Sequence, residues 1–159
     1  MILILIQCGM HNCLSIPFDK LLKNGFNTRQ TDVRAAGSVN TAMQLVAVIF
    51  QLQSLQQFGG VSATHIDWTM VPYVRKSFIK YWKDGLNYIK GKSQKEIDEI
   101  CKDINVVETS IDDDVYKKYD DVYRFAKAMT VKEVHQSVEA LYHNLNTLQS
   151  RSGGLIASV

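Results

Sequence analysis

The chain has 159 residues, of which 46% are hydrophobic, 21% charged and 9% aromatic, and it contains only two prolines. This composition is typical of an ordered globular domain and excludes a disordered or collagen-like chain. The formal net charge of +2 lies far below the basic excess of proteins that coat duplex nucleic acid. We therefore expect no duplex nucleic-acid partner.

Cysteine usage and the first residues indicate a reducing compartment. Cys8, Cys13 and Cys101 are an odd number in a chain too large to need disulfides, so we expect free thiols. The apolar run Met1–Ile6 is too short for a membrane span of about 20 residues, and it lacks the flanks of a signal peptide. These features predict a cytoplasmic protein without membrane association.

The first quarter of the chain favours short extended segments. Residues 1–7 and 11–16 are compatible with strands, and a short helix over 18–23 is predicted to end at Gly25. Residues 26–37 mix polar types without a clear period and are interpreted as a loop.

Two long helices are predicted next. Ser38 is a suitable N-cap for a helix that continues to Gln57. Its apolar residues surround nearly the whole circumference and its polar residues are mostly uncharged glutamines, which indicates a helix buried on most sides or packed against a partner. After a connection over 61–67, residues 69–89 predict a second helix, with Pro72 in its first turn.

The second half carries stronger helix-start signals. Capping-box patterns at Ser93–Glu96 and Thr130–Glu133 predict helices over 94–105 and 131–149. Residues 112–129 predict another helix, whose acidic first turn suits the helix dipole. The predicted fold is therefore mainly α, with one or two short strands near the N-terminus.

A first candidate for chemistry is Cys13, at the end of a predicted strand beside His11 and Asn12. Polar neighbours can tune a thiol for redox or radical chemistry, although most single cysteines act as small buried hydrophobic residues. Cys8 and Cys13 without a second pair make a weak metal motif.

A second candidate is the polar segment that contains Arg29 and Arg34 and leads to the Ser38 helix. Free N–H groups at a helix start attract anions, so this segment can bind a phosphorylated nucleotide. The alternative is an ordinary solvated loop.

The third candidate is His135, Glu139 and His143, which follow one another at four-residue intervals on one predicted helix face. That geometry can hold zinc, but it also arises by chance on surface helices.

Two longer stretches resemble a known family. The segment from His11 to Phe78, which includes QSLQQFGG, and the later LYHNLNTLQSRSG over 141–153 are similar to the anaerobic (class III) ribonucleoside-triphosphate reductases of the glycyl radical family. The resemblance implies a partial fragment of a ten-stranded α/β barrel over residues 11–153. Residues 1–10 and 154–159 are interpreted as segments foreign to the family.

The resemblance implies an enzyme that reduces ribonucleoside triphosphates to deoxyribonucleoside triphosphates. Members are homodimers that use a glycyl radical, formed by a radical-activating enzyme, together with a structural zinc and nucleotide effectors. Cys13 matches the family's cysteine on the first barrel strand, which faces the substrate opposite the thiyl cysteine. We expect none of these cofactors to be held by this chain itself.

The helix that begins at Ser38 resembles the one at the family's dimer interface, near the effector site. Gln44 and Gln51 are seven residues apart and therefore share one stripe of this helix. Their amides need partners, which a second copy or a bound nucleotide can supply. We expect an antiparallel helix pair, with Arg29 and Arg34 contacting effector phosphates.

The chain also departs from the family. It lacks the thiyl-cysteine loop, the four-cysteine zinc site and the glycyl-radical loop, and Gly153 is followed by an unrelated apolar tail. We therefore expect a truncated chain that is inactive alone. The alternatives are a non-enzymatic helical module for dimerisation or nucleotide binding, and a histidine-based metal-binding helix.

Overall fold

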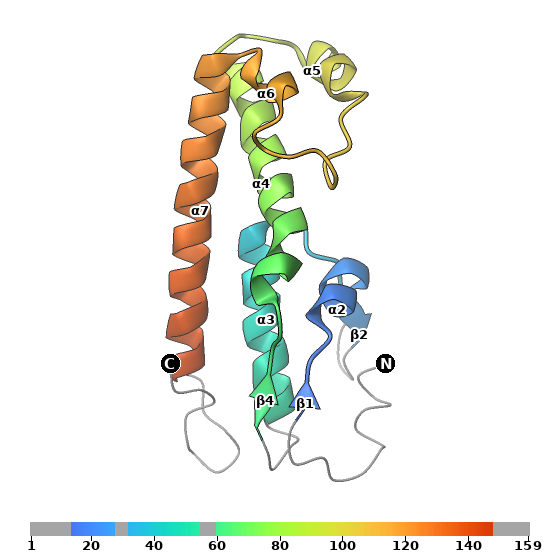
Figure 1. Ribbon diagram of the computed structural model, residues 1–159, viewed down its shortest axis with the longest axis vertical. Coiled ribbons are helices and arrows are strands. Elements are labelled where there is room, and N and C mark those ends of the chain that lie inside the picture. Colours follow the sequence, from blue (N-terminus) through green and yellow to red (C-terminus); the bar gives the residue numbers. More distant parts are fainter. Residues whose placement is uncertain (1–13, 28–31, 55–59, 148–159) are drawn as a thin grey trace.

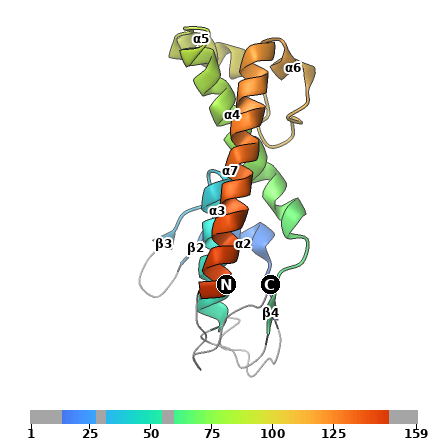
Figure 2. The same ribbon diagram turned by 90° about the vertical axis from the view of Figure 1, so that its left-hand side faces the viewer.

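The molecule is an elongated bundle of three long helices with short elements at one side. The computed structural model describes residues 14–27, 32–54 and 60–147. Figures 1 and 2 show that α7 runs alongside α4 in one half of the molecule and alongside α3 in the other, in agreement with the packing between these elements. The long helices are α3 (Val39–Ser54), α4 (Ile66–Tyr88) and α7 (Asp120–Thr147). The prediction of a mainly helical chain is confirmed.

The strands are shorter and more numerous than the sequence predicted. The described residues contain four two-residue strands in two separate pairs. β1 (Leu14–Ser15) pairs in parallel with β4 (Val61–Ser62), and β2 (Phe26–Asn27) pairs antiparallel with β3 (Asp32–Val33). The residues interpreted as a loop and as a connection therefore contain a small hairpin and a strand. Helix α2 (Phe18–Asn24) lies between β1 and the hairpin.

Two of the predicted helix starts are confirmed. Ser38 Oγ accepts a hydrogen bond from Thr41 N at 3.2 Å, and Ser93 forms a complete capping box with Glu96. Helix α5 (Gln94–Cys101) nevertheless ends four residues before the predicted end at 105.

The start predicted at Thr130 is wrong. Thr130 is buried in the middle of α7, where its Oγ1 donates to Ala126 O at 2.7 Å. The hydroxyl is satisfied by the preceding turn instead of capping a new helix, so the helix continues through it. The two helices predicted over 112–129 and 131–149 are thus the four-residue α6 (Asp114–Lys117) and the single long α7.

Helix α4 also begins earlier than predicted. Its first residue is Ile66, preceded by His65 with a left-handed φ of 52°, and Pro72 consequently lies inside the helix rather than in its first turn. Within the described ranges, no helix combines the length and the apolar character needed to cross a bilayer.

The buried side chains form two separate clusters. One joins α2, α3, the first half of α4 and the hairpin, and it includes Leu22, Val39 and Val46. The other joins the second half of α4 to α5, α6 and the start of α7 around the fully buried Trp82. Trp82 Nε1 donates to Tyr116 O at 3.3 Å and the two rings meet edge to face, while burial raises the pKa of Tyr116 to about 12.

A close contact between Gly85 of α4 and the side chains of α7 fixes how these two helices cross. A Cβ atom on Gly85 would lie 2.8 Å from Val122 Cγ1 and 3.3 Å from Phe125 Cδ1. Val122 is fully buried and β-branched, so it has little freedom to move away. Glycine at this position therefore sets how closely the two helices pack.

Candidate functional site

The strand that follows Cys13 is firmly attached to the body of the protein. Cys13 lies outside the described residues, and β1 begins with the next residue. Beyond the pairing of β1 with β4, Ile16 N donates to Ser62 O at 3.0 Å, and the Ile16 side chain is buried. The backbone immediately after Cys13 is thus held in place by β4.

The N-terminus of α3 is buried against α4. Val39 is fully buried, and its N–H donates to Ser77 Oγ of α4 at 3.0 Å. Lys76 of α4 donates from Nζ to Ala36 O at 3.1 Å, which also ties the preceding residues to α4. Two consecutive residues of α4 therefore position the start of α3.

This arrangement changes the interpretation of the anion-binding candidate. The N–H groups of Val39 and Thr41 are bonded to the hydroxyls of Ser77 and Ser38, so they are not free to bind phosphate. Arg34 is exposed between β3 and α3, whereas Arg29 lies outside the described residues. Anion binding here would depend on the arginine side chains.

A glycine shapes the hairpin that precedes Arg34. Gly25 has a φ of +72°, in a region that residues with a Cβ rarely adopt, and a Cβ there would overlap Val33 O. The hairpin therefore packs directly against the end of α2, which fixes where the chain leaves β3 toward Arg34.

Helix α3 presents an uncharged face to solvent. Thr41, Gln44 and Val48 are exposed along one stripe, and Gln51 is half-buried on the same side. The exposed fraction of Val48 is 44%, and no residue of this 16-residue helix is charged. Gln44 and Gln51 thus lie two turns apart along one face of α3, as predicted, and the ideal rise of about 1.5 Å per residue corresponds to a separation of about 10 Å. We call Thr41, Gln44, Val48 and Gln51 the outer face of α3.

Gln53 is a buried glutamine of α3 that was not among the predicted site residues. Gln53 is 4% exposed, on the opposite side of α3 from the outer face. Gln53 lies seven residues after Val46 and fourteen after Val39, both of which are fully buried. This spacing places all three on one helix face and would have predicted that Gln53 is buried.

The three residues proposed for zinc do not form a metal site. His135, Glu139 and His143 are all exposed on α7. No group of three or more histidine, cysteine, aspartate or glutamate side chains suited to a metal ion occurs among residues 14–27, 32–54 and 60–147.

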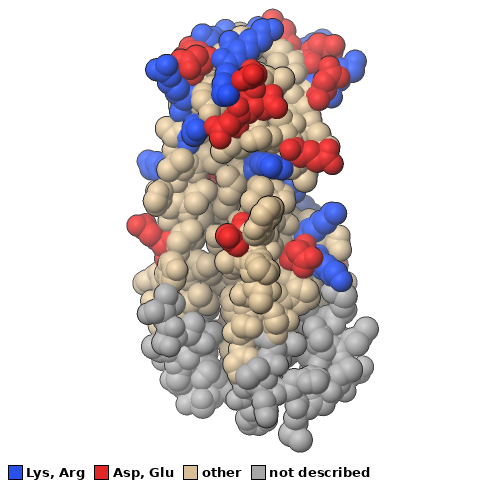
Figure 3. All heavy atoms as spheres, viewed as in Figure 1, with Lys and Arg blue, Asp and Glu red and all other residues tan. Residues whose placement is uncertain are grey.

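Charges are distributed unevenly along the molecule. In Figure 3 the charged side chains gather over the end formed by α5, α6 and the adjoining ends of α4 and α7, and they are sparse over the rest of this face. In α7, four of the first eight residues are charged, whereas Glu139 is the only aspartate, glutamate, lysine or arginine from Val134 to Thr147. The second half of α7 is therefore much less charged than its start.

Comparison with known proteins identifies the family to which this helical segment belongs. The sequence model of the family described as anaerobic ribonucleoside-triphosphate reductase matches residues 3–156. Reductases of that name from Haemophilus influenzae and Escherichia coli K12 are 24% and 22% identical over 144 residues, which is 91% of this chain. The one from enterobacteria phage T4 is 27% identical over 94 residues, or 54% of the chain.

The chain belongs to the anaerobic ribonucleoside-triphosphate reductase family. It spans 16% of the length of each of these curated relatives. The family match begins before residue 11 and ends after residue 153. The segments 1–10 and 154–159, predicted to be foreign, lie outside the described residues.

We predict that Ser77→Ala lowers the free energy of unfolding by about 1–3 kcal/mol, because it leaves the buried Val39 N–H without an acceptor. Ser137→Ala is the matched control. Ser137 is also buried in a helix, but its hydroxyl only donates to Glu133 O of the preceding turn. Urea denaturation followed by circular dichroism measures both variants, and equal stability losses would contradict the role of Ser77.

Proposed function

We propose that this chain is part of an anaerobic enzyme that reduces ribonucleoside triphosphates to deoxyribonucleoside triphosphates. The observation that carries the proposal is the family match over residues 3–156. The relatives named for this activity are much longer, since the chain spans 16% of their length. The activity is therefore a property of the assembled enzyme, to which this segment contributes structure and binding residues.

The parallel pairing of β1 with β4 supports a place in an α/β barrel. Parallel strands need a crossover connection, usually through a helix, and β1 reaches β4 through α2, the hairpin and α3. In this proposal β1 and β4 are neighbouring strands of the ten-stranded barrel, and their outer edges pair with further strands of the enzyme. Cys13, directly before β1, then presents its thiol to the substrate.

The outer face of α3 is proposed as the contact with a second copy of the chain. Helix α3 has no charged residue and exposes Val48, so this face is better suited to contact with protein than to contact with water. Symmetric dimers bring the same patch of both copies together, so Gln44 and Gln51 can bond across the axis or to a nucleotide effector beside it. Arg29 and Arg34 are the proposed contacts to the effector phosphates.

In the assembled enzyme a glycyl radical, formed by a separate activating enzyme, would supply the unpaired electron and pass it to the thiyl cysteine that abstracts the ribose hydrogen. The described part of this chain is proposed only to position Cys13 on the other side of the substrate. The described residues contain no set of side chains that fits the family's structural zinc, so we assign no ligand for it here. We place the enzyme in the cytoplasm, where the thiol of Cys13 remains reduced.

We predict that the purified 159-residue chain, supplied with a ribonucleoside triphosphate, an activating enzyme and a reductant, forms no deoxynucleotide. The comparison sample is a full-length relative that carries this segment. It should form deoxynucleotide under the same conditions, and the Cys13→Ser substitution should abolish that activity. Product from the isolated chain, or undiminished turnover of the full-length Cys13 variant, would contradict the proposal. In the second case this segment contributes no reacting cysteine, and its role is dimerisation or nucleotide binding alone.

We predict that Val48→Lys weakens self-association of the chain by more than about tenfold, because it puts a charge into an apolar contact. Val115→Lys is the control, since Val115 has a similar exposed fraction, 48%, but lies on α6. Sedimentation equilibrium measures the dissociation constants. If both variants associate as the unmodified chain does, the outer face of α3 is not the interface.

A further inference from the structure

The segment that joins the hairpin to α3, residues 34–37, is fixed at Ala36 although it belongs to no helix or strand. The Ala36 side chain is 1% exposed, and both of its backbone polar groups are bonded. Its N–H donates to Leu22 O of α2 at 3.0 Å, and its carbonyl oxygen accepts from Lys76 Nζ of α4 at 3.1 Å. Ala36 is therefore held between α2 and α4.

An aromatic ring keeps the Lys76 ammonium in this position. The Nζ atom lies 5.1 Å from the centre of the Tyr73 ring, and Tyr73 is 4% exposed. Burial, together with the carboxylate of Asp19 in α2, raises the pKa of the Tyr73 hydroxyl. The ring therefore stays uncharged, and its face attracts the ammonium. In the part of the chain that the structure describes, Lys76 forms no ion pair with a carboxylate.

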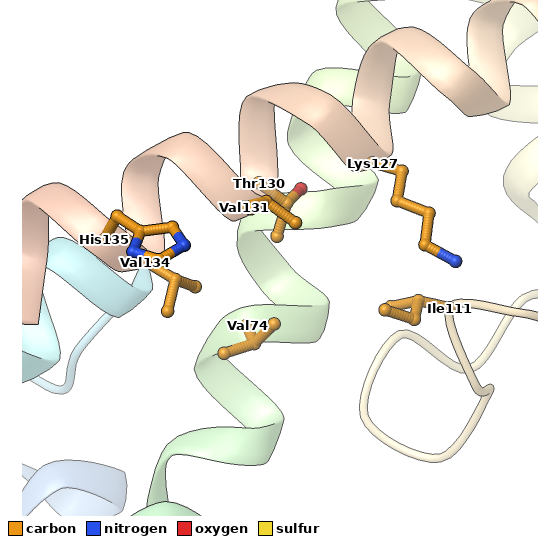
Figure 4. A pocket seen from close by; sticks show the side chains of 7 residues that line it. All are labelled: Val74, Ile111, Lys127, Thr130, Val131, Val134 and His135. Atoms are coloured by element: carbon orange, nitrogen blue, oxygen red, sulfur yellow. The ribbon is translucent and has the colours of Figure 1, made fainter.

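The opposite side of α4 has different neighbours at this level. Val74 lines an apolar pocket of about 150 Å³ together with Val131 and Val134 of α7, as Figure 4 shows. Successive helix residues are about 100° apart, so Lys76 lies about 200° around α4 from Val74. Lys76 thus extends from the side of α4 that faces Ala36, not from the side that faces α7.

Arg34 lies two residues before this fixed point, and the end of α2 restrains it as well. A Cβ atom on Gly25 would lie 3.0 Å from Ala35 N and 3.1 Å from the carbonyl carbon of Arg34, so this stretch packs directly on the end of α2. The Arg34 side chain itself is exposed. The backbone near Arg34 is thus fixed, while its guanidinium remains accessible to a ligand.

We propose that Lys76 is a positioning residue for effector binding: through Ala36 it holds Arg34 where its guanidinium contacts the effector phosphates. This inference rests on the proposed function, in which Arg34 is a phosphate contact. An arginine whose backbone is already fixed loses less conformational entropy when it binds, which strengthens the contact. Lys76 acts through the backbone, because its partly buried ammonium is directed to the Ala36 carbonyl and the Tyr73 ring.

A spin label at position 34 tests the positioning step on the 159-residue chain without any nucleotide. With the three native cysteines replaced by serine, Arg34→Cys carries the nitroxide. Lys76→Met removes the ammonium but keeps an apolar side chain near the Tyr73 ring, and it should shorten the rotational correlation time of the label about twofold. Lys76→Arg keeps a donor and should leave the label unchanged. Lys80→Met is the control, because it removes the same charge from an exposed lysine whose Nζ also lies near a ring, 5.5 Å from the centre of Tyr81.

A second label position separates local loosening from general unfolding. Lys23→Cys places the nitroxide on the exposed last turn of α2, where Lys76→Met should not change its motion. Unchanged motion of the label at position 34 in Lys76→Met, or equal changes at positions 34 and 23, overturns the proposal.

Binding of deoxythymidine triphosphate (dTTP) to a full-length relative that carries this segment tests the functional step. Arg34→Gln should weaken binding about tenfold and Lys76→Met about fivefold, whereas Lys80→Met should have no effect. Because Lys76 acts through Arg34, the double variant of Arg34→Gln with Lys76→Met should bind no more weakly than Arg34→Gln alone. Unchanged binding in Lys76→Met, or a further loss of about fivefold in the double variant, contradicts this role of Lys76.

The single variant Arg34→Gln separates this inference from the proposed function. If it leaves dTTP binding unchanged, Arg34 is not a phosphate contact, and both that assignment and the effector role of Lys76 are wrong. If Arg34→Gln weakens binding and Lys76→Met does not, the phosphate contact stands and only the positioning role is wrong.

Discussion

The rest of the structure depends on the burial of an uncharged helix. Helix α3 has no charged residue with which to face water, and it is covered on one side by α4 and α7. Its first N–H group, at Val39, is satisfied by the hydroxyl of Ser77 in α4. A buried N–H without a partner would cost more than one ordinary hydrogen bond contributes, so this contact fixes the position of α3. That position determines which face of α3 remains outside.

Short sequence patterns correctly predicted the helix starts that depend only on neighbouring residues. Ser38 and Ser93 cap helices as expected because each hydroxyl bonds an N–H within three residues. Thr130 shows the same sequence pattern, yet it is buried at the packing of α7 on its neighbours and bonds backward to Ala126. The parallel pairing of β1 with β4 joins residues 47 positions apart, and the bond from Val39 N to Ser77 Oγ joins residues 38 apart, so local patterns could not reveal them. Of the candidate site, the stripe of Gln44 and Gln51 and the Ser38 cap followed from local patterns, whereas the bond from Val39 N to Ser77 Oγ did not.

The two ends of the molecule suit different surroundings. The end with α5 and α6 has its own aromatic core around Trp82 and a charged surface, and it is well suited to contact with water. The other end carries the uncharged helix α3 and the short strands, with exposed charges on α2 and the hairpin. In the proposed enzyme the end with α5 and α6 projects from the barrel, and the end with α3 joins the barrel strands and the second copy.

Photo-crosslinking tests most directly whether the outer face of α3 meets a second copy. A benzophenone amino acid at position 48, in the otherwise unmodified chain, should give a covalent dimer on irradiation, with the crosslink mapping to α3 of the other copy. The same amino acid at position 115 should give none. A crosslink from position 48 to another element, or dimers from position 115 alone, would contradict the account.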